Sequence, residues 1–282
     1  MANAPQHSDA RGTGLAVALL IVGLVVVGGV GATLYATGRW WLPPVASAHG
    51  VAIDRLFYST LVITGVVFIG VHVLLALFVW RFAARGAGRA VYFHDHRRLE
   101  LTYTIIPAIA LAIMVAMSGI VWARVRLGAP PADALVVDVR GEQFAWLARY
   151  PGPDGRFGRV DPRRIDARTN PMGLDPEDPA ARDDVVSRTL HLVVGRPVRV
   201  QLRSTGVLHS FFVPEFRVKQ DTVPGMTIEI WFTPTREGQF EIACAELCGI
   251  GHYAMRGQVV VQSPEAFAAW LAQQRPALAP AP

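Results

Sequence analysis

The chain has 282 residues, of which 52% are hydrophobic and 17% are charged. Soluble domains usually carry about a quarter charged residues, so this composition, with a mean hydropathy of +0.32, excludes an ordinary soluble domain, a disordered chain and a coiled coil. The isoelectric point near 9.7 does not indicate nucleic-acid binding. The positive excess is confined to residues 1–126, which hold ten Arg and four acidic residues among the apolar stretches, where such charge sets membrane orientation.

Three stretches lack Asp, Glu, Lys and Arg, and each is long enough to cross a bilayer, which takes about 20 apolar residues. They contain 27, 25 and 23 residues and lie between Arg11 and Arg39, between Arg55 and Arg81, and between Glu100 and Arg124. The loop between the second and third holds Arg81, Arg85, Arg89, Arg97 and Arg98 against Asp95 and Glu100. The positive-inside rule places this loop in the cytoplasm and everything after Leu127 on the outer face.

The first apolar stretch has two interpretations. Ala46-Ser47-Ala48 is similar to a signal-peptidase site, which would make residues 1–48 a cleaved leader. The run is longer than the 7–15 apolar residues of a signal peptide, and Trp40 and Trp41 at its end are typical of an interfacial belt, which favours a retained helix. Either way, residues 1–50 form an N-terminal segment ahead of a transmembrane helical hairpin at residues 51–126.

Residues 127–275 predict an outer domain made mainly of β-strands. Alternation of apolar and polar residues predicts strands at 136–140, 189–194, 198–203, 226–232, 239–243 and 258–261. The polar insert at 151–184 is expected to be a long surface loop without a core of its own. A helix is expected at 264–274, capped by Ser263, before a Pro/Ala tail at 276–282. Short strands with Pro/Gly turns indicate a sandwich or barrel.

The segment C-A-E-L-C-G-I-G-H-Y-A-M, residues 244–255, concentrates metal-binding side chains, and His209 lies 35 residues before its first cysteine. The chain's two cysteines are too few for a disulfide scaffold, although a Cys244–Cys248 disulfide is one alternative for a CxxxC pair outside the cytoplasm. Structural zinc favours four Cys or His ligands. Two thiols, two imidazoles and a Met thioether instead favour copper in an electron-transfer site.

These motifs resemble subunit II of the haem–copper cytochrome c oxidases. The resemblance rests on V-L-H-S-F-F-V-P at 207–214, V-K-Q-D-T-V-P-G at 218–225, and the cysteine segment, and it covers residues 51–275. It implies a membrane-anchored, all-β protein whose outer domain is a cupredoxin-like sandwich or barrel. No CxxCH motif for covalent haem occurs.

The resemblance also implies a role for each metal-binding residue. Cys244 and Cys248 would bridge the two ions of a binuclear copper A centre, and His209 and His252 would each bind one of them. Met255 would be a weak ligand to one copper and the backbone carbonyl of Glu246 to the other. The Glu246 carboxylate would bind a magnesium ion at the interface with subunit I.

Two further segments match the family. E-L-T-Y-T-I-I-P at 100–107 implies that Glu100 lies at the mouth of a proton channel into subunit I. G-E-Q-F-A-W at 141–146 resembles the aromatic segment over the copper site, where electrons enter. The usual Trp of that segment is Phe144 here, and Trp146, two residues on, is expected to point to the same strand face and to substitute for it.

The sequence departs from the family at the surface that binds cytochrome c. Gly206 stands where many members carry an Asp, and the outer domain has a net charge of −1. Its acids cluster at Asp175, Glu177, Asp178, Asp183 and Asp184. Weak charge steering is therefore expected, and the donor would be a membrane-bound or complex-associated cytochrome rather than a free basic one.

The leading hypothesis is an electron-transfer subunit that takes electrons from cytochrome c and passes them to haem in subunit I, where oxygen is reduced and protons are pumped. Its setting would be the inner membrane of a bacterium, with the outer domain in the periplasm, lipid and further subunits as partners, and no nucleic acid. Alternatives are the copper A subunit of a nitric oxide reductase, a quinol oxidase subunit and a membrane-tethered copper-binding protein. His72, in the second apolar stretch, is expected to bond to a neighbouring helix, and Gly23, Gly28, Gly29 and Gly31 to allow close helix packing.

Overall fold

The computed structural model describes residues 7–38, 40–83, 91–92 and 94–279. The chain divides into two compact units, which are described separately below. One consists of Met1–Leu42 and Arg55–Ile120, and the other of Pro43–Asp54 and Val121–Pro282. Arg39, Arg85 and Arg89, which the charge argument uses, lie outside the described residues.

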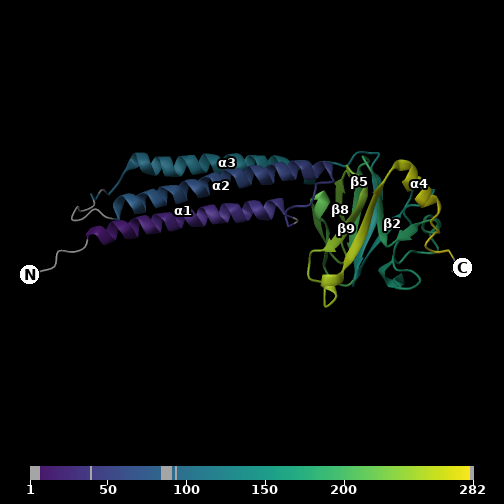
Figure 1. Ribbon diagram of the computed structural model, residues 1–282. Helices are drawn as coiled ribbons and strands as arrows, with labels where there is room; N and C mark the ends of the chain where they lie inside the picture. The colour runs from purple at the N-terminus through teal and green to yellow at the C-terminus, as the bar shows by residue number, and fades with distance from the viewer. Residues whose placement is uncertain (1–6, 39, 84–90, 93, 280–282) are drawn as a thin grey trace, which may run out of the picture. The chain divides into compact units, whose positions relative to one another are not determined.

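The first unit is helical, as the three charge-free stretches predict (Figure 1). The helices are α1 (His7–Thr37), α2 (Ala48–Phe82) and α3 (Arg97–Arg126). All three are long and apolar enough to cross a membrane, so the chain has an N-terminal helix in addition to the hairpin. Trp41 donates its indole N–H to the Tyr58 hydroxyl at 2.8 Å. This bond ties the segment that follows α1 to the first half of α2.

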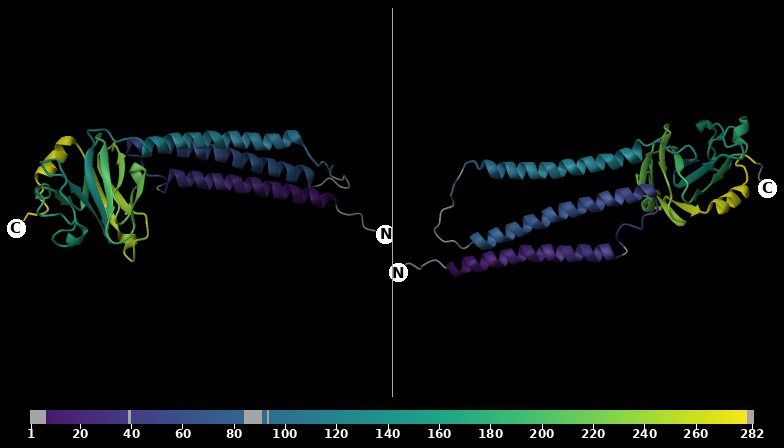
Figure 2. Two further views of the ribbon diagram at one scale, coloured as in Figure 1. Left: turned by 180° about the vertical axis from the view of Figure 1, so that it is seen from behind. Right: turned by 90° about the horizontal axis from the view of Figure 1, so that it is seen from above.

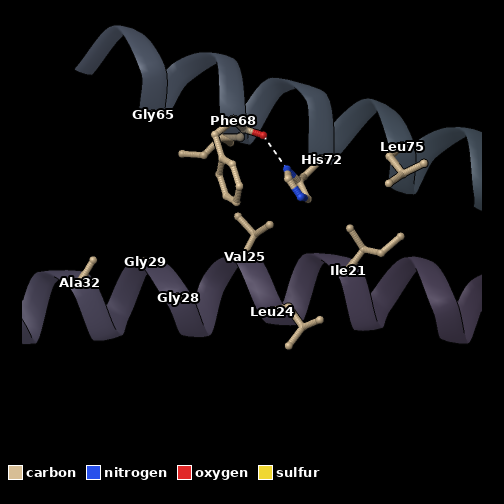
Figure 3. A pocket seen from close by; sticks show the side chains of 11 residues that line it. Ile21, Leu24, Val25, Gly28, Gly29, Ala32, Gly65, Phe68, His72 and Leu75 are labelled. Atoms are coloured by element: carbon tan, nitrogen blue, oxygen red, sulfur yellow. Dashed lines mark hydrogen bonds between the residues drawn. The ribbon is translucent and has the colours of Figure 1, made fainter. Parts of the chain in front are cut away.

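The apolar faces of α1 and α2 enclose a cavity of about 560 Å³ (Figure 3). The prediction of close packing at Gly28 and Gly29 is wrong, because a Cβ at either position would meet nothing within 4 Å. The prediction that His72 bonds to a neighbouring helix is also wrong. Its Nδ1 lies 2.8 Å from the carbonyl oxygen of Phe68, one turn earlier in the same helix. The cavity-lining residues of α1 are all apolar, so that carbonyl is the available partner.

The second unit is a sandwich of two five-stranded sheets, with a short helix packed beside them (Figures 1 and 2). The first sheet has the order β3-β2-β1-β5-β8, and its strands are β1 (Leu135–Glu142), β2 (Ala145–Tyr150), β3 (Val185–Ser187), β5 (Val198–Ser204) and β8 (Ile228–Phe232). The second has the order β4-β10-β9-β6-β7, and its strands are β4 (Thr189–Val193), β6 (His209–Val213), β7 (Val218–Thr222), β9 (Gly238–Cys244) and β10 (Arg256–Gln262). The predicted membrane-anchored β-sandwich is confirmed.

Alternation along the strands explains the core. In β5 the residues Val198, Val200 and Leu202 are buried and their neighbours are partly exposed, which is the period-two pattern of a sheet with one face on a core. All six predicted strands are present, and helix α4 (Pro264–Ala272) begins after Ser263, whose Oγ accepts a hydrogen bond from the Ala266 N–H. Burying these apolar side chains stabilises the fold by about 25 cal/mol per Å² of apolar surface.

The insert at 151–184 differs from its prediction. It was expected to lack a core, but Met172, Leu174 and Ala181 are buried with Leu147 of β2 in a second small cluster. Two short 3-10 turns, η1 (Pro162–Arg164) and η2 (Pro179–Ala181), shape the insert. Each begins after an Asp whose side chain accepts a backbone N–H. The few apolar residues among many polar ones concealed this cluster in the sequence.

The segment Pro43–Asp54, which includes the start of α2, belongs to the outer domain. Ala46 and Ser47 are fully buried. The Ser47 hydroxyl donates to the Phe216 carbonyl at 2.6 Å and accepts from the Gly50 N–H at 3.0 Å. Arg217 pairs with Asp54 at 2.7 Å. The residues that resemble a signal-peptidase site are therefore part of the domain's packed structure.

Candidate metal centre

Two paired strands and one loop carry the candidate ligands. His209 is the first residue of β6, and Cys244 is the last residue of β9. These strands pair antiparallel with Phe211 opposite Cys244, which brings two residues 35 positions apart in sequence to the same end of the sheet. Cys248 lies in the loop that follows, His252 begins the 3-10 turn η4 (His252–Ala254), and Met255 directly precedes β10.

The five side chains form one connected cluster. The Cys244 sulfur is 3.8 Å from Nδ1 of His209 and 3.8 Å from the Cys248 sulfur. The Cys248 sulfur is in turn 3.7 Å from Nδ1 of His252 and 3.7 Å from the Met255 sulfur. The carbonyl oxygen of Glu246 is 3.2 Å from the Cys244 sulfur. All five predicted side-chain ligands and the predicted carbonyl thus converge on one pair of sulfurs.

The sulfur separation fits a metal and not a disulfide. A disulfide holds its sulfurs about 2.05 Å apart, whereas Cys244 and Cys248 are free and 3.8 Å apart. With typical metal–thiolate bonds of about 2.3 Å, that separation subtends about 110° at a shared ion, close to a tetrahedral angle. The ligand atoms of His209, Cys244 and Cys248 all lie within 4.8 Å of one another. The donor set is soft, as copper prefers.

The protonation states also suit metal binding. Burial, with a smaller effect of nearby His252, lowers the pKa of His209, so its imidazole is neutral and carries a free lone pair at pH 7. Burial, reinforced by the Cys244 thiol, raises the pKa of Cys248 to about 11. The metal-free thiol is therefore neutral, and a bound metal would displace its proton.

His209 is positioned by packing. A Cβ at Gly141 would lie 3.1 Å from the His209 ring and 3.1 Å from the Trp146 ring, so a side chain there would press on both rings. The Trp146 ring stands edge-on to the His209 ring at 6.1 Å between centroids. The Thr222 hydroxyl donates to the His209 carbonyl at 3.2 Å. Sequence reasoning treated Gly141 only as part of a motif and did not find this role.

The loop carrying Cys248 is held from the first sheet. The side-chain N–H of Gln143 donates to the Cys248 carbonyl at 2.6 Å. The Phe144 ring lies directly against Gly251, where a Cβ would be 2.5 Å from it. Sequence reasoning missed Gln143, although its place in the G-E-Q-F segment was a usable signal.

The expectation that Phe144 and Trp146 share a strand face is wrong. Phe144 lies in the turn between β1 and β2, and only Trp146 lies within β2. Strand alternation therefore does not relate them. Phe144 is 36% exposed and covers the metal-site loop, whereas Trp146 is 3% exposed and packs on His209 and Phe211. A docked protein can touch Phe144 but not Trp146.

Three further residues were singled out in the sequence. The Glu246 side chain is exposed, next to the cluster. Glu100 is in the first turn of α3, in the helical unit. Gly206 has a φ of +84° in the turn between β5 and β6, a conformation that favours glycine.

The acidic cluster is largely neutralised. Asp184 is fully buried and pairs with Arg149 at 3.0 Å. Asp175 and Asp178 pair with Arg159 at 3.0 and 3.7 Å. Three of the five acids are therefore paired with arginines, whereas Glu177 is exposed.

Comparisons with known proteins agree with this architecture. Residues 35–120 match the family of the cytochrome c oxidase subunit II transmembrane domain, and residues 135–263 match that of its periplasmic domain. The chain is 42% identical to alternative cytochrome c oxidase subunit 2 of Bradyrhizobium diazoefficiens, over 93% of this chain and 92% of that one. It is 34% identical to cytochrome c oxidase subunit 2 of Cereibacter sphaeroides, over 82% and 79% of the two chains. The crystal structure of the periplasmic domain of subunit II of cytochrome oxidase from Bradyrhizobium japonicum matches with 29% identity and a TM-score of 0.37, over 51% of this chain and 95% of that one.

Proposed function

Because the chain belongs to the cytochrome c oxidase subunit II family, we propose that its sulfur and imidazole cluster is a binuclear copper A centre. The chain is a membrane-anchored electron-transfer subunit of a haem–copper oxidase, an oxidoreductase complex. The observation that carries the copper proposal is the connected set of five ligand side chains around two thiols 3.8 Å apart.

In this proposal the thiolates of Cys244 and Cys248 would hold both copper ions, and His209 and His252 would each hold one of them. Met255 and the Glu246 carbonyl are weak ligands. Such a centre supplies one-electron transfer, with the charge shared between two metals. The chain's own contribution is rigidity, because two strands, Gly141 packing and the Gln143 bond hold the ligands in place. A fixed geometry reduces the rearrangement that accompanies electron transfer.

The burial of the ligands favours electron transfer over copper delivery. Met255 is 1% exposed and Cys248 3% exposed. A protein that hands copper to a partner needs ligands that the partner can reach. Both belong to the buried core cluster of the sandwich.

We assign Phe144 as the point where electrons enter, because it is exposed and covers the loop that carries His252. The donor is a cytochrome c, and the acceptor is haem in subunit I. The neutralised acids argue for a donor that is tethered or bound in the complex. The exposed Glu246 carboxylate, adjacent to the centre, is available to a magnesium ion shared with subunit I.

We assign Glu100 to proton uptake for oxygen reduction. It begins α3, at the end of the arginine-rich loop, and the positive-inside rule puts that loop in the cytoplasm. The outer domain then lies in the periplasm, and the helices cross the bacterial inner membrane. Replacing Glu100 with Gln should lower the kcat of the assembled oxidase and leave the rate of copper reduction unchanged. Unaltered turnover at saturating donor would contradict this role.

Metal analysis of the purified chain tests the copper proposal. The wild-type chain should hold two coppers, and Cys244→Ser and Cys248→Ser should each lose the bridged pair. Each of these thiols contacts three other candidate ligands, so both variants should have the same effect. Ser263→Ala, which removes a helix cap far from the sulfurs, is the control and should retain both. One copper per chain, or a preference for zinc, would contradict the proposal.

A further inference from the structure

A second cavity, of about 450 Å³, opens in the outer domain. Arg140 of β1 and Arg203 of β5 line it, together with Ser204, Thr205 and Gly206 at the end of β5 and in the turn that follows. Its remaining walls come from the insert and from the loop between β7 and β8. No acidic side chain lines it. The lining thus carries two arginines and three hydroxyl-bearing residues, Ser204, Thr205 and Thr227.

Arg140 is buried without adequate partners. The residue is 4% exposed, and its one hydrogen bond runs from Nη1 to the Pro171 carbonyl at 3.2 Å. Its Nε is buried and has no partner in the described part of the chain. Burial lowers the pKa of the Arg140 guanidinium, yet arginine remains charged in proteins. A buried charge without a counter-charge is costly.

The neighbouring acids do not neutralise Arg140. Asp138 accepts from Arg149 at 2.7 Å and pairs with Arg203 at 3.3 Å. Asp184 pairs with Arg149 at 3.0 Å. These two acids therefore balance two arginines, and the charge of Arg140 is left over. Asp138 exerts the largest attraction on the Arg140 charge and Glu142 the smallest of the charge effects, but Asp138 is shared with Arg149 and Arg203.

We propose that this cavity binds an oxyanion, the carboxylate or phosphate group of a ligand, through Arg140 and Arg203. Guanidinium groups favour such anions because their N–H groups match the spacing of the anion's oxygens. The Ser204 hydroxyl donates to the Val207 carbonyl, so the further donors that line the cavity are the hydroxyls of Thr205 and Thr227. Gly206 and Met226 are exposed at its opening, so an anion reaches the cavity from the aqueous side.

Two short chain segments link residues that line the cavity to His209. Arg140 precedes Gly141, whose backbone packs on the His209 ring, and Gly206 is three residues before His209 in the sequence. A negative charge in this cavity would favour the more positively charged, oxidised form of the metal centre. This consequence rests on the proposed copper site, whereas anion binding does not.

Calorimetric titration of the purified full-length chain with inorganic phosphate, at constant ionic strength, tests the proposal. The wild-type chain should bind one phosphate saturably. Arg140→Gln should weaken binding at least about tenfold, because a hydrogen bond to a charged group contributes about 1.5–3 kcal/mol. Thr205→Glu supplies the chain's own carboxylate to the two arginines and should abolish binding while keeping the fold. Arg188→Gln, an exposed arginine between β3 and β4, is the matched control and should bind as the wild type does.

A second measurement distinguishes the source of the anion. If the ligand is a carboxylate of the docked electron donor, saturating phosphate should slow copper reduction by that donor in the wild type but not in Thr205→Glu. If the ligand is a free anion, phosphate should bind without competing with the donor. The absence of saturable phosphate binding in the wild type, or equal binding in the wild type and Thr205→Glu, would overturn the proposal. Either result can be obtained whether or not the chain holds copper.

Discussion

Replacing Arg149 with Met should destabilise the outer domain and make its stability strongly dependent on pH. Arg149 donates to Asp138 at 2.7 Å and to Asp184 at 3.0 Å, and all three side chains are at most 2% exposed. It also donates to the Gly158 carbonyl at 2.9 Å. One side chain therefore joins β1 and β2 to both ends of the insert.

The expected loss of stability depends on which acid the substitution leaves without a cation. Removing one partner of a buried ion pair typically costs 3–5 kcal/mol. Asp138 keeps Arg203 at 3.3 Å, so only Asp184 loses its cation, and we expect the low end, about 3 kcal/mol at pH 8. Burial already raises the pKa of Asp184 to about 6, and losing Arg149 raises it further.

The sign of the pH effect follows from this raised pKa. The Asp184 carboxyl binds a proton more readily in the folded state than in the unfolded state. Its contribution to the free energy of unfolding is therefore largest at low pH and is lost as the pH rises through the folded-state pKa. The decrease in the free energy of unfolding caused by Arg149→Met should therefore be smaller at pH 5 than at pH 8. Urea titration of the metal-free chain in detergent, followed by tryptophan fluorescence, measures the loss at both pH values.

Arg163→Met is the matched control, because Arg163 pairs with Asp161 at 2.9 Å but is 90% exposed. It should leave the urea midpoint unchanged. The reasoning would be refuted if Arg149→Met lowered the free energy of unfolding by less than about 1 kcal/mol, which is the range typical of a surface pair. It would also be refuted by a decrease of equal size at pH 5 and pH 8.

Three further predictions concern other parts of the chain. Met255→Leu should keep the copper but shift its reduction potential in a redox titration, because a weak axial ligand tunes the metal without holding it; loss of copper would contradict this. The purified chain should retain residues 43–48, because Ser47 is buried in the domain; an N-terminus after Ala48 by mass spectrometry would contradict it. Burial lowers the pKa of His191, which stacks on Trp270 at 3.8 Å between ring centroids, so stability should fall as the pH drops below about 6.5. His191→Phe should flatten that dependence in urea titrations, and an unchanged profile would count against it.

Patterns that repeat along the chain were readable from the sequence. Charge-free length predicted α1, α2 and α3, and alternation predicted six strands, including β5 and β8. The metal-binding side chains were recognisable because thiols, imidazoles and a thioether are rare in combination, and four of the five fall within twelve residues. The capped helix α4 was predictable because Ser263 and Pro264 are local signals.

Features that depend on contacts between distant segments could not be predicted from the sequence. Trp146 is buried and Phe144 exposed because a turn separates Phe144 from β2, and the position of that turn depends on the pairing of β1 with β2. Ser47 belongs to the outer domain through a bond to Phe216, 169 residues away. The second cavity combines Arg140 and Arg203 from paired strands with the turn at Gly206. Each is a consequence of tertiary structure, which local residue patterns do not encode.

Electron paramagnetic resonance of the purified, copper-loaded chain tests the binuclear copper centre most directly. One-electron oxidation of the fully reduced centre should give a single unpaired electron shared by two equivalent copper nuclei, with the corresponding hyperfine pattern. The pattern should disappear in Cys244→Ser and survive in Met255→Leu with altered splitting. The hyperfine pattern of one copper nucleus in the wild-type chain would contradict the assignment of His209, Cys244, Cys248 and His252 as ligands of a shared pair.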